Sequence, residues 1–242
     1  MKRLLAAGLA TLIVGLVIIF PARVAYNWFA PAELKLSGID GSVWRGTASE
    51  ALAGGAYLRD ISWRFEPLSL LRGRIAFGTQ GNAGGGPIDA RVAIGIDGSL
   101  ILSDVAGMVP LDLVHATFQE GGIRGDLGLQ FSKLVVRDAI PVEMDGAITI
   151  ANLLAPLLSP TVIGNYRADF TTTDAGVTAD VNSVSGVLNV TGTLTLAEDR
   201  SYTLIGKVSA TPETPASITR QLRFLGSPDA EGRHDFRFEG AL

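Results

Sequence analysis

The sequence of residues 61–67 is ISWRFEP, in which apolar and polar side chains alternate until a proline ends the run. Successive side chains of a β-strand point to opposite faces, so Ile61, Trp63 and Phe65 share one face. Proline has no backbone N–H for a strand ladder, and Pro67 therefore marks the end of the strand. The stretch predicts a strand with one apolar and one polar face.

The same alternation recurs through most of the chain, interrupted by glycine, proline and Asp-Gly turn signals. The alternating runs lie at residues 74–78, 88–96, 99–105, 123–131, 188–196, 202–208 and 234–242. Short strands at this spacing predict an antiparallel β-sheet or a two-sheet stack rather than a parallel α/β fold.

Two segments depart from the strand pattern. Residues 79–87 (TQGNAGGGP) are glycine-rich, and we expect a flexible loop or hairpin tip there. A phosphate-binding loop is not expected, because no Lys-Ser/Thr pair follows the glycines. Residues 216–225 (ASITRQLRFL) carry apolar side chains at helical spacing before Gly226, which predicts a short C-terminal helix.

The N-terminal segment has a different character. Residues 4–20 (LLAAGLATLIVGLVIIF) contain no charge, and as a helix they would span about 25 Å. Extension to residue 25 matches the hydrocarbon thickness of a bilayer, and the aromatic residues that follow suit the membrane interface. These aromatic residues are Tyr26, Trp28 and Phe29.

The organisation that follows from this segment has three parts. We expect a cytoplasmic tail at residues 1–3, a transmembrane anchor at residues 4–25 and a β-rich domain at residues 26–242. Lys2 and Arg3 precede the apolar run, and the positive-inside rule then places the N-terminus in the cytoplasm and the domain in the periplasm.

Three other interpretations of the apolar run fit the sequence less well. A cleavable signal peptide has the same basic start, but its apolar region is usually shorter, and Phe20 or Arg23 would spoil the cleavage motif. A buried globular helix is disfavoured because the run is apolar on every face. A lipoprotein anchor is excluded because the chain has no cysteine.

Composition excludes several functional classes. The 242 residues include 29 glycines, 11 prolines and no cysteine, so the domain folds without disulfides. The net charge of −4 disfavours nucleic-acid binding, which needs a basic face. The two histidines, His115 and His234, lack the spacing of a metal site or catalytic triad, and we interpret both as surface or interface residues. No catalytic residue, metal ligand or cofactor is expected, and the protein is not expected to be an enzyme.

Glycines and aromatic residues recur in a distinctive order along the chain. The elements are Gly38-x-x-Gly41-x-Val43-Trp44-x-Gly46, Trp63-x-x-x-Pro67-x-x-Leu70-x-x-Gly73, Gly164-x-Tyr166, and Leu222-x-x-Leu225-Gly226 followed by Gly240. This order resembles the type II secretion system protein N family, and single elements also resemble the larger AsmA-like group. We interpret these glycines and aromatics as fold determinants, with Trp44 and Trp63 in the core.

The resemblance implies a single-pass inner-membrane protein of Gram-negative bacteria with a periplasmic β domain. It would be an accessory subunit of the machinery that exports folded proteins across the outer membrane. Its implied partners are the membrane itself, the inner-membrane platform proteins and the outer-membrane secretin. The AsmA-like kinship implies a curved sheet with an apolar inner face.

Two functional hypotheses remain open. In the first, the domain is a structural interaction module, and exposed sheet edges invite strand addition from a partner. In the second, it is an AsmA-like lipid-handling or envelope-biogenesis protein whose apolar groove shields acyl chains. Strand alternation fits both, whereas the motif order favours the first.

Overall fold

The computed structural model describes residues 8, 15–30, 34–53, 56–84, 86–114, 121–138, 140–174, 176–197 and 199–241. Its helical elements are α2 (Ala22–Phe29), η1 (Pro67–Arg72), η2 (Leu111–Leu113), α4 (Ala216–Leu222) and η3 (Arg223–Leu225). The first strands are β1 (Leu34–Ser37), β2 (Asp40–Gly41), β3 (Arg45–Ala53), β4 (Ala56–Phe65), β5 (Arg74–Asn82), β6 (Pro87–Gly95) and β7 (Leu100–Pro110). The others are β8 (Arg124–Arg137), β9 (Ile140–Leu154), β10 (Gly164–Thr173), β11 (Gly176–Gly186), β12 (Leu188–Leu196), β13 (Ser201–Ala210) and β14 (His234–Ala241).

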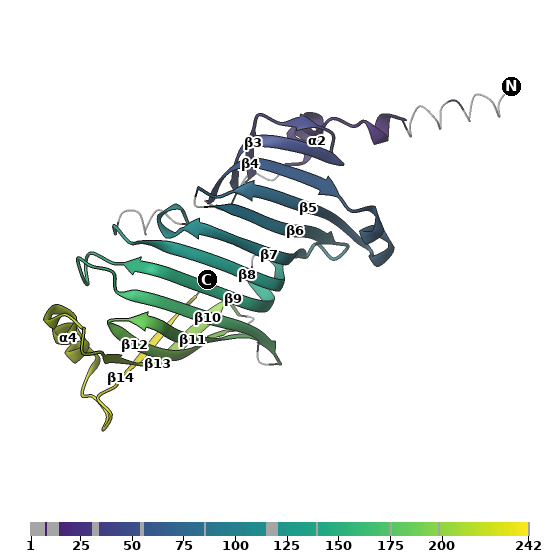
Figure 1. Ribbon diagram of the computed structural model, residues 1–242. Coiled ribbons are helices and arrows are strands. Elements are labelled where there is room, and N and C mark those ends of the chain that lie inside the picture. The colour runs from purple at the N-terminus through teal and green to yellow at the C-terminus, as the bar shows by residue number, and fades with distance from the viewer. Residues whose placement is uncertain are drawn as a thin grey trace.

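The strands form one 14-stranded sheet in which neighbours in space are neighbours in the chain, with β2 as a short addition beside β3. Every pairing is antiparallel. Figure 1 shows that the strand direction rotates steadily from β3 to β14, as the right-handed twist of strands requires. The antiparallel, curved sheet and the short C-terminal helix α4 are confirmed, and the sheet is single rather than a two-sheet stack.

Bulges bend this sheet at residues with left-handed backbone. Asp60 (φ 52°), Asp104 (φ 50°) and Asn152 (φ 54°) lie at or beside register shifts in β4, β7 and β9. An extra residue in one strand reverses the face of every side chain beyond it. Leu102 and Val105 accordingly pack in the same core cluster although their odd spacing would put them on opposite faces of a regular strand.

One face of the sheet is apolar and carries the main core. The cluster is made by strand residues alone, namely Val105, Phe131, Met144, Phe170, Val177 and Ala179. Val177 and Ala179 are each only 1% exposed, although all of the described strands belong to one sheet. The sheet therefore curves enough for side chains of β7 to β12 to cover one another.

A smaller cluster covers the N-terminal part of the apolar face. Ala22 of α2 packs there with Ile39 and Ala48, and with the partly buried Tyr26 and Trp63. The hydroxyl of Tyr26 donates to the carbonyl of residue 34 at 3.1 Å and accepts from the amide of residue 36 at 3.0 Å, which fixes α2 to β1. In this part of the sheet the helix α2 buries the apolar side chains, whereas farther along they are buried by the curvature of the sheet.

The predicted anchor lies partly outside the described residues. Residues 15–18 are helical, but Pro21 has an extended backbone (φ −66°, ψ 134°) and bridges to Ser42 of the domain. The expected continuation of one helix through Pro21 to Ala25 is therefore wrong. Among the helices formed by described residues, none combines the length and apolarity needed to cross a bilayer. Trp28 and Phe29 are exposed as an interfacial position requires, whereas Tyr26 is packed against the sheet.

The predicted glycine-rich loop at residues 79–87 is mostly strand. Thr79 to Asn82 continue β5, and Pro87 already begins β6. The register of these residues with β4 and β6 supplies ladder hydrogen bonds that outweigh their low strand propensity. Between the two strands, the amide of Ala83 donates to the carbonyl of Gly86 at 3.1 Å.

Candidate functional site

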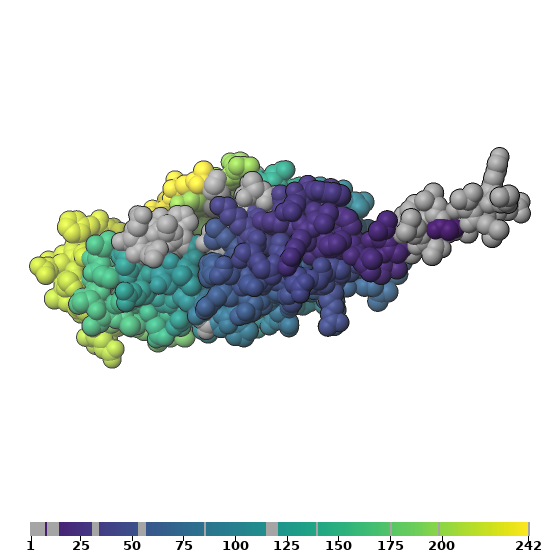
Figure 2. All heavy atoms as spheres, turned by 90° about the horizontal axis from the view of Figure 1, so that it is seen from above, coloured from purple at the N-terminus to yellow at the C-terminus, as the bar shows by residue number. Residues whose placement is uncertain are grey.

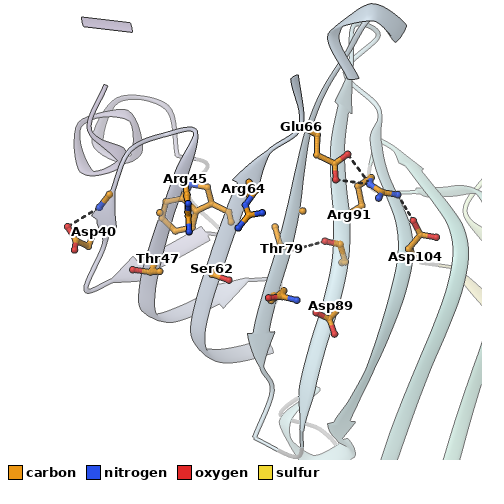
Figure 3. A pocket seen from close by; sticks show the side chains of 16 residues that line it. Asp40, Arg45, Thr47, Ser62, Arg64, Glu66, Thr79, Asp89, Arg91 and Asp104 are labelled. Atoms are coloured by element: carbon orange, nitrogen blue, oxygen red, sulfur yellow. Dashed lines mark hydrogen bonds and ion pairs between the residues drawn. The ribbon is translucent and has the colours of Figure 1, made fainter. Parts of the chain in front are cut away.

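A polar depression lies on the sheet face opposite the main core, across β3 to β7. Its volume is about 740 Å³. One row of paired residues crosses it from Arg45 through Arg64 and Gly78 to Arg91. Because Gly78 has no side chain, the middle of this row is hollow, and an added Cβ would find its nearest neighbour, Glu66 Oε1, only at 3.5 Å. Figure 3 shows the charged side chains that stand around this hollow.

Arg91 is fully engaged within the depression. Its Nε donates to both carboxylate oxygens of Glu66, at 2.9 and 3.0 Å, and its Nη1 pairs with Asp104. The hydrogen bond that Arg91 donates to Glu66, followed by the charge of Glu66, raises the pKa of Arg91. The left-handed backbone at Asp104 belongs to the β7 bulge, so the bulge helps to place this carboxylate beside β6.

Arg45 and Arg64 differ from Arg91. They are directly opposite each other on β3 and β4, and within the described chain neither guanidinium has an ion pair. Two like charges in a directly opposed cross-strand pair disfavour each other. The next row consists of Thr47, Ser62, Gln80 and Asp89, and both arginines are exposed to solvent. The arrangement is suited to bind a carboxylate-bearing partner.

Potential metal ligands and the two histidines bear on what chemistry the depression could support. Among the described residues, no group of three or more His, Cys, Asp or Glu side chains could hold a metal ion. His115 lies outside the described residues. His234 is 8% exposed and its Nδ1 lies 2.9 Å from the carbonyl oxygen of Gly226, so His234 is not a surface residue, and its interpretation as an interface residue stays a prediction.

The glycines of the first motif lie in and beside the turn between β2 and β3, and Gly46 lies against Trp63. Gly38 (φ 62°) and Gly41 (φ 88°) have backbone conformations that disfavour other residues. A Cβ on Gly46 would lie 2.4 Å from the Trp63 ring, whose Nε1 donates to the carbonyl of Val43 at 3.1 Å. The motif thus closes a tight turn under one tryptophan.

Trp44 is not a core residue of the sheet. Its Nε1 donates to the carbonyl of Val17 at 2.7 Å, and its ring centroid lies 4.8 Å from that of Phe65. The amide of Val43 also donates to the carbonyl of Phe20 at 3.0 Å. Trp44 therefore connects the N-terminal segment to the end of β4.

The remaining motif residues lie apart from one another. Pro67 is the first residue of η1, and Gly73 (φ 66°) ends it. Gly164 (φ 156°) begins β10, where the half-buried Tyr166 has its pKa raised by burial. Gly226 (φ 105°) follows η3, and a Cβ on Gly240 would lie 2.7 Å from the ring of Tyr202.

The charged lining of the depression was not singled out from the sequence. The alternation of residues 61–67 placed Arg64 and Glu66 on the polar face of their strand. What the sequence did not show is that Arg45, Arg64, Gly78 and Arg91 share one row, since this depends on the register of four strands. The nearest local signal is the sequence Arg64-Phe65-Glu66, in which the two charged residues share one strand face.

The sheet also has two outer edges, β1 and β14. β14 pairs with β13 alone among the described strands, and alternating charges Asp235, Arg237 and Glu239 lie along it. Charged side chains on an edge strand oppose unselective pairing with other chains.

Comparison with known proteins identifies relatives across nearly the whole chain. The profile of the family "Type II secretion system (T2SS), protein N" matches residues 32–237. A Vibrio cholerae protein named Type II secretion system protein N is 26% identical over 260 residues, covering 100% of both chains. An Aeromonas hydrophila protein of the same name is 23% identical over 225 residues, covering 88% of this chain and 86% of its own. No solved structure gives a significant match to the chain. With the family profile spanning the β domain from before β1 into β14, the chain belongs to the type II secretion system protein N family.

Proposed function

We propose that the chain is an accessory inner-membrane subunit of the type II secretion machinery. Its β domain is a membrane-tethered periplasmic interaction module that supports export of folded proteins across the outer membrane. Family membership and the uncharged sequence of residues 4–20 support this assignment. The partners are other inner-membrane platform proteins and the secretin.

The opposed pair Arg45 and Arg64 is the observation on which the interaction role rests. Directly opposed like charges lower stability, so a fold that keeps them gains by binding an anion. They lie in a depression that is also lined by Asp40, Asp89 and small polar side chains, while Arg91 is already neutralised by Glu66 and Asp104. An acidic segment of another secretion component fits this charge pattern, because arginine recognises carboxylates through paired hydrogen bonds.

The lipid-handling alternative has less support. It requires an apolar face left open for acyl chains, yet Phe131, Val177 and Ala179 on that face are 4%, 1% and 1% exposed. Their burial among side chains of neighbouring strands leaves the centre of the face filled. The two described depressions lie instead on the polar face.

Charge reversal in cells tests the proposal. The double variant Arg45→Glu/Arg64→Glu should reduce secreted enzyme several-fold in a strain whose own copy of the gene has been deleted. Arg220→Glu, an exposed arginine on α4, is the matched control and should secrete at the wild-type level. Wild-type secretion by the double variant at equal protein amount would refute the role of the depression.

Photo-crosslinking identifies the bound partner. A photoreactive side chain at Gln80, inside the depression, should yield adducts with platform proteins or the secretin. The same probe at Thr203, on the polar side of β13, is the control and should yield few adducts. Adducts mainly with phospholipid at Gln80 would contradict a protein partner there.

A further inference from the structure

An exposed apolar corner stands at one end of the sheet. It comprises Leu68, Leu70 and Leu71 of η1 and Ile96 of the β6–β7 turn, which are 76%, 54%, 85% and 94% exposed. The two parts are neighbours, since a Cβ on Gly73 would lie 3.9 Å from Ile96 Cγ2. A cluster of exposed large apolar side chains on a soluble surface marks a contact with a partner or a membrane. We call this cluster the η1 corner.

Basic residues flank the η1 corner. Arg72 ends η1 and Arg74 begins β5, both are exposed, and in the described part of the chain neither guanidinium has an ion pair. The nearest acidic side chains in sequence are already paired, Glu66 with Arg91 and Asp97 with Arg137. Leucines beside unpaired arginines are the composition of a segment that lies in the interface of an anionic bilayer.

The η1 corner adjoins the N-terminal segment. Contacts pass from the carbonyl of Val17 to the indole of Trp44, and from that ring to Phe65, two residues before η1 begins. Side chains 16–19 of the N-terminal segment are themselves 50% to 68% exposed. In Figure 1 the β4–β5 connection lies on the same side of the sheet as the dark-purple residues that precede α2, and Figure 2 shows those dark-purple residues at one end of the molecule.

We infer that the η1 corner inserts its leucines into the interface of the phospholipid bilayer as a second, non-spanning attachment beside the N-terminal segment. This inference rests on the proposed membrane tether. The leucines enter the boundary between headgroups and acyl chains, while Arg72 and Arg74 bind anionic headgroups. Two attachments hold the domain in one orientation, with the ends of β4 and β6 facing the membrane.

The absence of cysteine in the chain allows single, unique labels on the full-length protein. Leu71→Cys, Ile18→Cys and Leu157→Cys are labelled with an environment-sensitive fluorophore and reconstituted in vesicles of phosphatidylcholine and phosphatidylglycerol in equal amounts. Leu157 is the matched control, because it is 82% exposed and follows β9, whose end lies at the opposite end of the antiparallel sheet. Spin-labelled lipids then quench only fluorophores that lie in the bilayer.

The expected result is quenching at Ile18 and Leu71 and none at Leu157. Quenching at Ile18 with none at Leu71 would overturn the inference and leave the membrane tether intact. Absence of quenching at Ile18 would overturn the tether itself, and with it the basis of the proposed location.

The arginines provide a second measurement. Near an anionic membrane surface each arginine is worth about 1 kcal/mol, so replacement of Arg72 or Arg74 by Gln should lower the equilibrium constant for docking of the corner about fivefold. Quenching at Leu71 should fall in these variants and in vesicles of phosphatidylcholine alone, while quenching at Ile18 stays unchanged. Quenching at Leu71 that is independent of both changes would refute the role of the arginines.

Discussion

The two halves of the apolar face are buried in different ways. Toward the N-terminus, α2 lies over the sheet and packs Ala22 and Tyr26 against Ile39 and Ala48. Toward the C-terminus, strand residues from β7 to β12 bury one another without a covering helix. A single sheet thus forms a buried core in two ways, with the helix α2 as a cover at one end and with its own curvature at the other.

The difference shows what each half depends on. Curvature requires large side chains that meet across the concave surface, such as Phe131 and Phe170, whose ring centroids are 6.0 Å apart. The covered half requires one helix held in place by a few polar bonds and by tight glycine contacts. Truncation of a large core side chain in the curved half should therefore cause the largest loss of stability. Loss of a single contact in the covered half should cause a smaller one.

The largest effect is expected for Phe131→Ala. Phe131 is 4% exposed in the main cluster, and its truncation should lower the free energy of unfolding by about 3–5 kcal/mol. Urea unfolding of the variant measures the change. Phe224→Ala, at a side chain 90% exposed, is the control and should change stability by less than about 0.5 kcal/mol. Similar losses in both would mean that curvature does not bury the core.

A smaller loss is expected for Gly46→Ala in the covered half. The new Cβ would lie 2.4 Å from the Trp63 ring and 2.5 Å from the Asp40 carbonyl oxygen, which costs about 1–3 kcal/mol through overpacking. Gly86→Ala is the control, since an added Cβ there meets no atom within 4 Å. Equal unfolding midpoints of the two variants would argue against the tight contact under Trp63.

Tyr26→Phe tests the bond between helix and sheet. Removal of the hydroxyl leaves the amide of Leu36 without its partner, and we expect a loss of about 1–2 kcal/mol. Hydrogen exchange at that amide should accelerate at the same time. Tyr57→Phe removes an exposed hydroxyl that donates to Glu50 and should cost less than about 0.5 kcal/mol. Unchanged exchange at Leu36 would contradict the role of Tyr26.

The smallest effect is expected for the pH dependence of stability that arises from Asp229, in the loop before the last strand. A hydrogen bond from Lys207, then one from the amide of Arg233, holds the pKa of Asp229 well below its ordinary value of 3.8. A carboxyl with a depressed folded pKa stabilises the fold above that ordinary value, and the contribution is lost as the pH falls below it. Urea midpoints between pH 7 and pH 2 should therefore fall more steeply in the wild type than in Asp229→Asn. Parallel curves would show that the loop before β14 adds nothing to stability.

Local sequence patterns predicted where the strands lie, but they did not predict for every residue which face of the sheet its side chain is on. The alternation of Leu127, Leu129 and Phe131 matches the pattern in β8, because no bulge interrupts those residues. The bulge at Asp104 is invisible in the sequence, since aspartate in a left-handed conformation is set by the pairing of β6 with β7. Beyond a bulge, the face on which a side chain lies depends on the pairing register, and the register is set by two strands together.

The candidate site was harder to predict for the same reason. Trp44 is a large aromatic residue of the kind that is expected in a core. Its position, however, is decided by contacts with Val17 and Phe65, which lie far before and after it in the chain. Arg45 and Arg64 are separated by a whole hairpin and meet only through the β3–β4 register. Single residues of the site are visible in the sequence, whereas their juxtaposition requires the sheet.

The strand order described above also decides how the protein assembles. From β3 onward each strand pairs with the one that precedes it in the chain, so no strand has to wait for a distant partner. Short loops cost little closure entropy, and folds built from such local pairings form quickly. A chain that emerges with its N-terminus first can add one hairpin at a time to a growing sheet. At each step a single unfinished edge is exposed to aggregation, and the charges of Asp235, Arg237 and Glu239 protect the last one.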